Sequence, residues 1–202
     1  MVEIEPGTFL PLSMRSLQRR ISQGVFHILS EAAEADGYNR RRYSSKFGKV
    51  FQESVERTLR RGVAFGSDDV PIAADVRYGS RKHPVDSSDV ILGYDRHPMF
   101  IEVVSGPLQA GTFTQGHLCC FEADADRLVV KKAKQLDRSI RDFFTGKLKI
   151  QGIDPEMVSY AWPVIVTSHP FPHMEFVIDE VERQARMEGY LQHERVGRLA
   201  IV

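Results

Sequence analysis

Two short runs rich in β-branched and aromatic residues constrain the fold of this chain more than any other feature. They cover residues 89–94 (DVILGY) and 99–104 (MFIEVV), and the turn-forming residues 95–98 (DRHP) separate them. Runs of this length on either side of a short polar loop predict an antiparallel β-hairpin. We therefore expect the two strands to be neighbours in one sheet.

The periodicity of apolar residues predicts helices and further strands around this hairpin. Helical spacing covers residues 13–36, 45–61, 124–144 and 175–188, and strand-like segments cover residues 70–78, 159–167 and 198–202. Gly62 and Gly146 follow predicted helix ends, where glycine is common. The long third helix connects two strands, and such crossovers favour parallel pairing. The order predicts an α/β fold with a mixed central β-sheet flanked by helices.

Two regions are expected: an N-terminal helical extension over residues 1–45 and a larger domain over residues 46–202. The first helix should end at Asp36-Gly37. Its apolar stripe comprises Leu17, Ile21, Val25, Ile28 and Leu29, and that of the second helix comprises Phe47, Phe51, Val55 and Leu59. The chain ends on an apolar strand (RLAIV), which leaves room for a longer parent protein.

Composition excludes some classes of protein. The 27 basic and 27 acidic side chains cancel, so the chain does not coat nucleic acid by bulk charge, although local basic patches remain possible. No signal peptide and no membrane span is predicted. The adjacent pair Cys119 and Cys120 is expected to stay reduced, because neighbouring cysteines seldom form a relaxed disulfide. We expect a cytoplasmic protein.

Asp89 and Glu102 are the candidate metal ligands. If the hairpin centres on Arg96-His97, Asp89 faces Val104 and Glu102 faces Ile91, and both carboxylates point to the same side of the sheet. They are then diagonal neighbours that could share a divalent cation. Glu102 lies in an otherwise apolar strand, where a lone carboxylate is costly unless it is paired or bound to metal. A wet sheet edge or a pairing arginine would equally explain it.

This pattern resembles the restriction-endonuclease-like, or PD-(D/E)xK, nuclease superfamily over about residues 47–166. The resemblance implies an αβββαβ core in which Asp89 and Glu102 bind Mg²⁺ or Mn²⁺ with help from the backbone carbonyl of Val103. Two positions depart from the family pattern: Ser88 replaces a proline, which is a common variation, and Val104 replaces the motif lysine. Either another lysine takes that role or catalysis has been lost.

The third helix offers a replacement lysine. Its core stripe is Val129, Ala133, Leu136, Ile140 and Phe143. At 100° per residue, Lys132 falls about 60° and Gln135 about 120° from the centre of this stripe, on the same flank. Lys131 and Lys134 point toward solvent. We expect Lys132 to be the active lysine and Gln135 to contact a metal-bound water or phosphate, although a solvated helix face would explain Lys132 as well.

Further candidates are less specific. Gln52 occupies a position where family members often place a glutamate, and it could hold a metal-bound water. The basic stretch Arg40-Arg41-Arg42-Tyr43, followed by Lys46, could contact phosphates and stack on a base, but a solvated linker would look the same. Asp75 and Asp86 could each supply a carboxylate, and surface solvation also accounts for them.

Together, these features predict a Mg²⁺-dependent endo- or exonuclease that hydrolyses phosphodiester bonds, with DNA favoured over RNA as substrate. A homodimer would allow both strands of a duplex to be cut. The alternative that Val104 and Gln52 keep open is a catalytically inactive nuclease fold that binds nucleic acid or a protein partner. A third is an unrelated α/β domain whose carboxylates are incidental.

Overall fold

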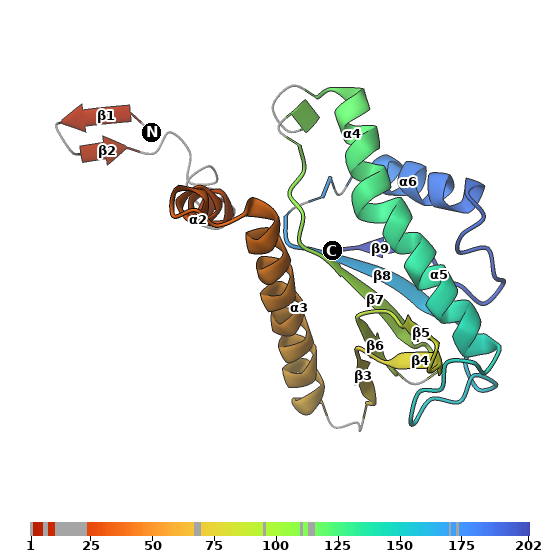
Figure 1. Cartoon of the computed structure of the whole chain (residues 1–202). Helices are drawn as coiled ribbons and strands as arrows, with labels where there is room; N and C mark the ends of the chain where they lie inside the picture. Colours follow the sequence, from red (N-terminus) through yellow and green to blue (C-terminus); the bar gives the residue numbers. More distant parts are fainter. Residues whose placement is uncertain are drawn as a thin grey trace. The chain divides into compact units, whose positions relative to one another are not determined.

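A five-stranded mixed sheet forms the centre of the fold in the computed structural model (Figure 1). The structure describes residues 2–5, 8–10, 24–66, 70–94, 96–109, 111–112, 116–169, 171–172 and 174–202. In spatial order the strands are β3 (Ile72–Ala74), β6 (Val90–Leu92), β7 (Met99–Val104), β8 (Trp162–Thr167) and β9 (Ala200–Ile201). The pairs β3–β6 and β6–β7 are antiparallel, and β7–β8 and β8–β9 are parallel. The predicted α/β class and mixed sheet are confirmed.

The chain divides into two compact units, Met1–Phe47 and Gly48–Val202. In the first unit, β1 (Val2–Glu5) and β2 (Thr8–Leu10) form a hairpin that the sequence did not predict. The helix α2 (Gly24–Ala35) ends where Asp36-Gly37 was expected to end it, and Gly37 has a φ of 80°. Such a left-handed residue is what glycine provides after a helix. Residues 13–23 of the predicted helix lie outside the described residues.

The apolar stripe predicted for the first helix is wrong where it can be checked. Ile28 and Leu29 are 52% and 50% exposed. Phe26 instead makes aromatic contacts in this unit, with its ring centroid 4.8 Å from that of Phe47 and 5.5 Å from that of Tyr43. Three aromatic rings therefore pack together where the aliphatic stripe was expected to.

The helix α3 (Arg40–Ala64) is longer than predicted at both ends. It begins at Arg40 because the Asn39 side chain caps it, with Oδ1 accepting a hydrogen bond from the backbone N–H of Arg41 at 2.8 Å. Gly62 lies inside the helix, so its prediction as the terminating glycine was wrong. An exposed glycine in a last turn costs only about 1 kcal/mol relative to alanine, and the turn accommodates it. The predicted stripe of this helix is half-buried.

A continuous helical segment from residue 118 to residue 144 covers one face of the sheet. It consists of α4 (Leu118–Ala125), the π-helix η2 (Asp126–Val130) and α5 (Lys131–Phe144). The five residues of the predicted core stripe are all buried, as expected. Phe143 packs edge-on against Phe100 of β7, with ring centroids 5.5 Å apart. Phe100 and Glu102 share a face of β7, so α5 covers the face that carries the candidate glutamate.

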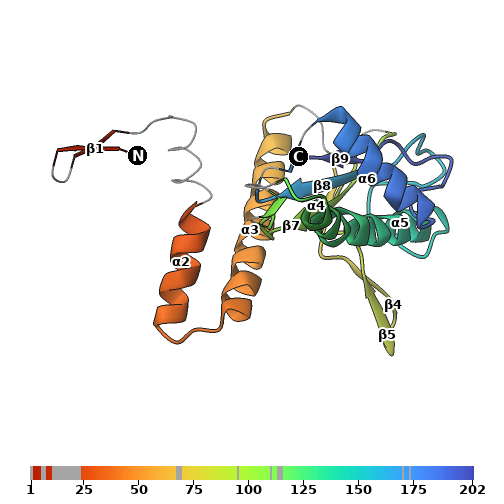
Figure 2. The same ribbon diagram turned by 90° about the horizontal axis from the view of Figure 1, so that it is seen from above.

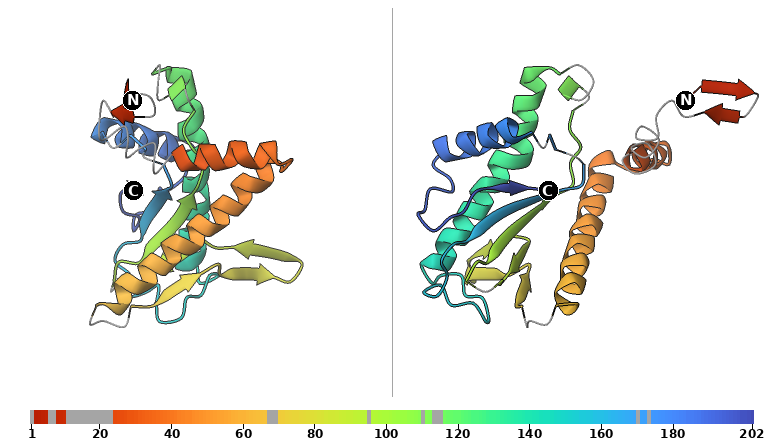
Figure 3. Two further views of the ribbon diagram at one scale, coloured as in Figure 1. Left: turned by 90° about the vertical axis from the view of Figure 1, so that its left-hand side faces the viewer. Right: turned by 180° about the vertical axis from the view of Figure 1, so that it is seen from behind.

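The second unit has three layers, which Figure 3 shows from two sides. The part of α3 that follows Gly48 lies on one side of the sheet, and α5 lies on the other. The helix α6 (Glu175–Met187) packs against η2 on the α5 side. Both parallel connections, β7 to β8 and β8 to β9, therefore cross over the same face, as right-handed crossovers in one direction require.

The strand predicted over residues 70–78 is divided in the structure. The strand β3 ends at Ala74, and Asp75 has a positive φ of 49°. The strands β4 (Arg77–Ser80) and β5 (His83–Asp86) then form a separate antiparallel hairpin. An aspartate tolerates the left-handed conformation better than most residues, and this allows the sharp change of direction.

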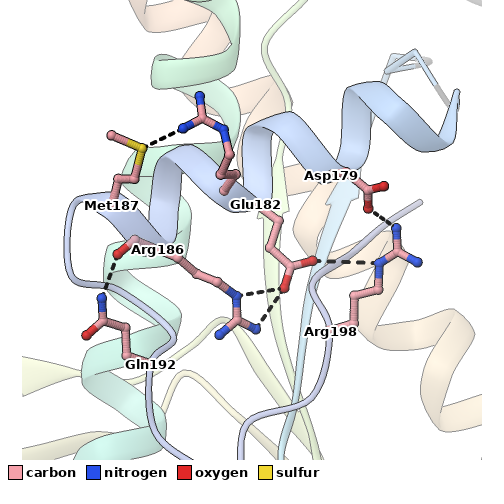
Figure 4. A pocket seen from close by; sticks show the side chains of 7 residues that line it. Asp179, Glu182, Arg186, Met187, Gln192 and Arg198 are labelled. Atoms are coloured by element: carbon pink, nitrogen blue, oxygen red, sulfur yellow. Dashed lines mark hydrogen bonds and ion pairs between the residues drawn. The ribbon is translucent and has the colours of Figure 1, made fainter.

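Ion pairs connect α6 to the segment before β9. Glu182 accepts hydrogen bonds from Arg186 at 2.8 and 3.0 Å, and its other oxygen lies 3.7 Å from Arg198, which also pairs with Asp179 (Figure 4). These residues line a surface pocket. Its arginines are paired with carboxylates of α6, so the network holds the C-terminal segment on that helix. None of the helices in the described ranges combines the length and apolar character that a bilayer crossing needs.

Candidate active site

Asp89 and Glu102 lie opposite each other on neighbouring strands. The register of β6 and β7 pairs Val90 with Ile101, which places Asp89, one residue before β6, across from Glu102. The predicted register was wrong by two residues. A shift of two preserves the side-chain face, so the two carboxylates still share one side of the sheet. They are direct cross-strand neighbours, closer than the diagonal pair that was expected.

Asp89 is held in place by the backbone of β7. Its Oδ2 accepts a hydrogen bond from the N–H of Val103 at 2.7 Å. Burial raises the pKa of Asp89, and this hydrogen bond opposes the rise. In a strand, the N–H and C=O of one residue point to the same side. The carbonyl of Val103 therefore faces the Asp89 side of the strand, where the resemblance expects a third metal ligand.

Glu102 is buried in the middle of the sheet, with 2% of its surface exposed. The pKa of Glu102 is raised to about 7, because burial outweighs the opposing effect of Lys132 and the charge of Asp89 adds to the rise. A wet sheet edge or an arginine partner does not describe this side chain, because β7 is the central strand and the partner is a lysine. A carboxylate kept in such a place needs a cation beside it.

Lys132 supplies one cation. Its Nζ lies 2.9 Å from Oε2 of Glu102, and its side chain is 26% exposed. It therefore lies at the border of the buried face of α5, as the helical angles predict. The neighbouring lysines point away: Lys131 is exposed and pairs with Asp126 at 2.8 Å, and the exposed Lys134 has its Nζ 5.9 Å from the ring centroid of Tyr190.

A polar pocket of about 590 Å³ opens above the two carboxylates. Its lining comes from α3, from the β4–β5 hairpin, from the hairpin's connection to β6, from β7 and from α5. The lining residues are Gln52, Asp75, Arg77, Pro84, Val85, Asp86, Ser87, Asp89, Glu102, Gln135 and Arg138. Predicted residues from three distant parts of the sequence, Gln52, Gln135 and the carboxylate pair, thus line one pocket.

Asp75 is a pocket residue that surface solvation does not fully describe. It is exposed, but its Oδ1 accepts a hydrogen bond from Nε2 of Gln52 at 2.9 Å, and its backbone N–H donates to the carbonyl of Asp89 at 3.2 Å. Its charge also contributes to the raised pKa of Asp89. The signal in the sequence was the aspartate within a predicted strand, which marks the break after β3.

Arg138 was not predicted. It lies three residues after Gln135 on α5, so the two side chains are neighbours on the helix surface. Its Nη2 donates to the backbone carbonyl of Asp86 at 2.9 Å. The carboxylate of Asp86 accepts a hydrogen bond from Arg77 at 2.7 Å. The spacing of polar residues on α5 at 132, 135 and 138 could have indicated Arg138 as a pocket residue.

The basic stretch 40–43 belongs to the first unit, and the alternative that it is a linker does not hold. These residues form the first turn of α3. The ring of Tyr43 stacks near that of Phe47, with centroids 6.4 Å apart, so it takes part in the aromatic cluster of that unit. The side chains of Arg41, Arg42 and Lys46 are exposed. Their role as phosphate contacts remains a prediction.

The donor set fits a hard divalent cation. Asp89 and Glu102 provide carboxylate oxygens on one face, and the Val103 carbonyl could add a neutral oxygen. Mg²⁺ usually keeps several waters and takes only one or two protein carboxylates. Within the described ranges, no group of three or more His, Cys, Asp and Glu side chains is arranged to hold a metal ion. The pair would therefore hold its ion together with water and substrate oxygens.

Burial is the largest cause of the raised pKa of both carboxylates, and the charge of Asp89 adds to the rise at Glu102. A bound cation would favour the ionised forms and so offset this cost of burial. Comparison of the chain with protein-family models, with curated proteins and with solved structures finds no match.

Proposed function

We propose that the chain is a metal-dependent nuclease that hydrolyses phosphodiester bonds, with a restriction-endonuclease-like PD-(D/E)xK fold. The observation that carries the proposal is Glu102, a glutamate buried on the central strand between Asp89 and Lys132. A purely structural role for Glu102 would be costly, because its carboxylate must be taken out of water. A catalytic site accepts that cost.

The order of elements supports this proposal. The helix α3, the three strands β3, β6 and β7, the helix α5 and the strand β8 follow one another in an αβββαβ order once the β4–β5 hairpin is set aside as an insertion. The departure at the motif lysine also has a structural basis. Val104 is 7% exposed and belongs to the hydrophobic core, while Lys132 reaches Glu102 from the helix above.

Each residue has a definite role in this reaction. Asp89, Glu102 and the Val103 carbonyl hold Mg²⁺ or Mn²⁺. When bound, the ion supplies charge neutralisation at the phosphate and lowers the pKa of an attacking water. Lys132 stabilises the negative charge that develops on the phosphate oxygens. Gln135 and Arg138 line the same pocket and offer hydrogen-bond donors to the substrate.

Location and assembly follow from the same proposal. Cys119 and Cys120 are free thiols, which suits the reducing cytoplasm, where we place the protein. A homodimer with two such sites would cut both strands of a duplex.

One cleavage experiment tests the proposal. Labelled single- and double-stranded DNA and RNA are incubated with the protein and Mg²⁺, Mn²⁺ or EDTA. We expect metal-dependent cutting that Glu102→Gln abolishes and that the exposed control Glu156→Gln retains. Unfolding curves of both variants establish that they fold. Absence of cutting on every substrate, with nucleic-acid binding intact, would favour the inactive nuclease fold that Val104 and Gln52 keep open.

A further inference from the structure

The β4–β5 hairpin is a separate two-stranded sheet beside the pocket. Its strands pair only with each other among the described residues, and Figure 2 shows the hairpin projecting away from the five-stranded sheet and its helices. An isolated two-stranded hairpin is only marginally stable in water. Its retention as a projecting element therefore calls for a role other than core formation.

The tip of the hairpin is basic. Ser80 pairs with His83, which leaves Arg81 and Lys82 as the two residues of the turn, and all four side chains are exposed. Two-residue hairpin turns strongly favour asparagine, aspartate and glycine. The backbone preferences of such turns do not explain an arginine and a lysine at these two positions. We therefore consider what their positive charge could bind.

The only carboxylate of the hairpin lies at its base and is already neutralised. Asp86 accepts a hydrogen bond from Arg77, its cross-strand partner, at 2.7 Å. No acidic side chain other than Asp86 lies in the hairpin. The projecting end therefore presents uncompensated positive charge, and this charge is complementary to a phosphate backbone.

The base of the hairpin is tied to the candidate active site. Residues of both strands, Arg77, Pro84, Val85 and Asp86, line the pocket that contains the carboxylates. The hydroxyl of Tyr78 donates to Asp142 of α5 at 2.7 Å, which anchors the hairpin to the helix that carries Lys132. A molecule held by the tip is thus held next to the pocket.

The dimensions of the hairpin favour duplex DNA. Each strand has four residues, and at about 3.4 Å per residue such a strand extends roughly 14 Å. The major groove of B-DNA is about 12 Å wide and 8.5 Å deep and admits a two-stranded β-ribbon. The major groove of A-form RNA is too narrow for side chains to enter.

We propose that the β4–β5 hairpin inserts into the major groove of double-stranded DNA, with Arg81 and Lys82 contacting phosphates, and thereby presents duplex DNA to the pocket. This inference rests on the proposed function, because it names the substrate of that site. It also makes the hairpin the element that discriminates duplex DNA from RNA and from single strands.

Binding of the three nucleic acids tests the inference. The variant Arg81→Glu/Lys82→Glu is prepared in a Glu102→Gln background, so that binding is measured without cutting. Fluorescence anisotropy is recorded with duplex DNA, duplex RNA and single-stranded DNA of one sequence. We expect duplex DNA to bind best. The Arg81→Glu/Lys82→Glu charge reversal should weaken the affinity for duplex DNA at least about tenfold near 0.1 M salt, and it should reduce the slope of log affinity against log salt concentration by about two.

The matched control reverses two exposed cations elsewhere. Lys134→Glu/Arg183→Glu changes the net charge equally on α5 and α6, and Figure 2 shows α6 on the opposite side from the hairpin. Equal weakening by both pairs, preference for RNA or single strands, or no binding to any nucleic acid would overturn the inference.

Cleavage by the hairpin variant with Glu102 intact separates the two proposals. Undiminished cutting of duplex DNA would overturn the hairpin inference and leave the nuclease standing. If the wild type cuts no substrate and the hairpin variant loses duplex DNA binding, the hairpin inference stands and the proposed nuclease activity is overturned.

Discussion

At the residue scale, the site depends on one ammonium group that comes from a helix and not from the strand. Position 104 of β7 faces the core and is occupied by valine. The ammonium of Lys132, on α5, lies 2.9 Å from the carboxylate of Glu102. The charge is thus placed beside the carboxylate while its long aliphatic stem packs along the border of the core.

Replacement of Lys132 by methionine should reduce nuclease activity by about 10²- to 10³-fold, the effect typical of removing one group that stabilises transition-state charge. Methionine keeps most of the aliphatic stem, so the fold should persist. The measurement is the single-turnover cleavage rate. Lys134→Met, on the solvent side of the same helix, is the control and should cut at the wild-type rate. Equal rates for both variants would remove Lys132 from the mechanism.

Glu102→Gln should raise the thermal stability of the metal-free protein at pH 8. The pKa of Glu102 in the folded state is raised from 4.5 to about 7, so ionisation is harder in the folded than in the unfolded chain. The charge of Glu102 therefore lowers the free energy of unfolding. This destabilisation is absent below pH 4.5 and complete above pH 7. Glutamine keeps a hydrogen-bond acceptor for Lys132 without the charge.

The same pair of proteins tests metal binding. Millimolar Mg²⁺ should raise the melting temperature of the wild type, because a ligand that binds only the folded state stabilises it, and it should leave Glu102→Gln nearly unchanged. Differential scanning calorimetry with and without EDTA makes the measurement. An equal metal shift in both proteins would place the ion elsewhere.

At the element scale, the π-helix η2 explains how one helical segment serves two neighbours. Leu128, Val129 and Val130 are consecutive and all buried, which a regular α-helix packed on one surface does not allow. The π turn packs on α6, while α5, which continues the same segment, packs on β7 and β8. It also directly precedes α5, so it sets the rotation of α5 about its axis and thereby the direction in which Lys132 points.

Asp124, near the end of α4, contacts two residues of the segment that follows β7, Gln109 and Thr112. It is fully buried and accepts hydrogen bonds from the N–H of Gln109 at 2.7 Å, from Thr112 at 2.8 Å and from Arg127 at 2.8 Å. Burial alone would raise the pKa of Asp124, but these donors outweigh it and lower the pKa below 3.8. One carboxylate therefore ties Gln109 and Thr112 to α4.

Asp124→Asn should destabilise the fold by about 1–3 kcal/mol at pH 7, because an amide cannot accept from all three donors. The sign of the pH dependence follows from the lowered pKa. The carboxylate contributes stability above its unfolded pKa and loses it as the pH falls through the folded value. Urea unfolding at pH 7 and at pH 3 measures the free energy of unfolding of both proteins. The difference between wild type and variant should be smaller at pH 3. A difference that grows would contradict the assignment.

At the scale of the whole molecule, the balance of charge limits how nucleic acid can be held. The formal net charge is zero, so attraction must come from local groups such as Arg81, Lys82 and Arg138 and not from the average surface. We expect the logarithm of the affinity for duplex DNA to fall with the logarithm of salt concentration with a slope near three, about 0.9 for each neutralised phosphate. A slope of eight or more would indicate a much larger basic surface than this pocket and hairpin provide.

Local patterns in the sequence were sufficient for the central elements. The composition of residues 89–104 predicts the hairpin of β6 and β7, and the buried stripe of α5 follows from its 3.6-residue period. The shared face of Asp89 and Glu102 also follows, because side-chain direction depends only on whether the register shift is even or odd. The flank position of Lys132 is likewise a property of its own helix.

Only the tertiary structure decided what these elements meet. The register of β6 and β7, the capped start of α3 at Arg40 and the break at Asp75 depend on single hydrogen bonds and turns that periodicity does not encode. The pocket itself joins Gln52, Asp75 and Arg138 from segments far apart in the chain. Such a meeting is set by how helices pack across a sheet, and that packing is decided by the summed contacts of the core and not by any local run of residues.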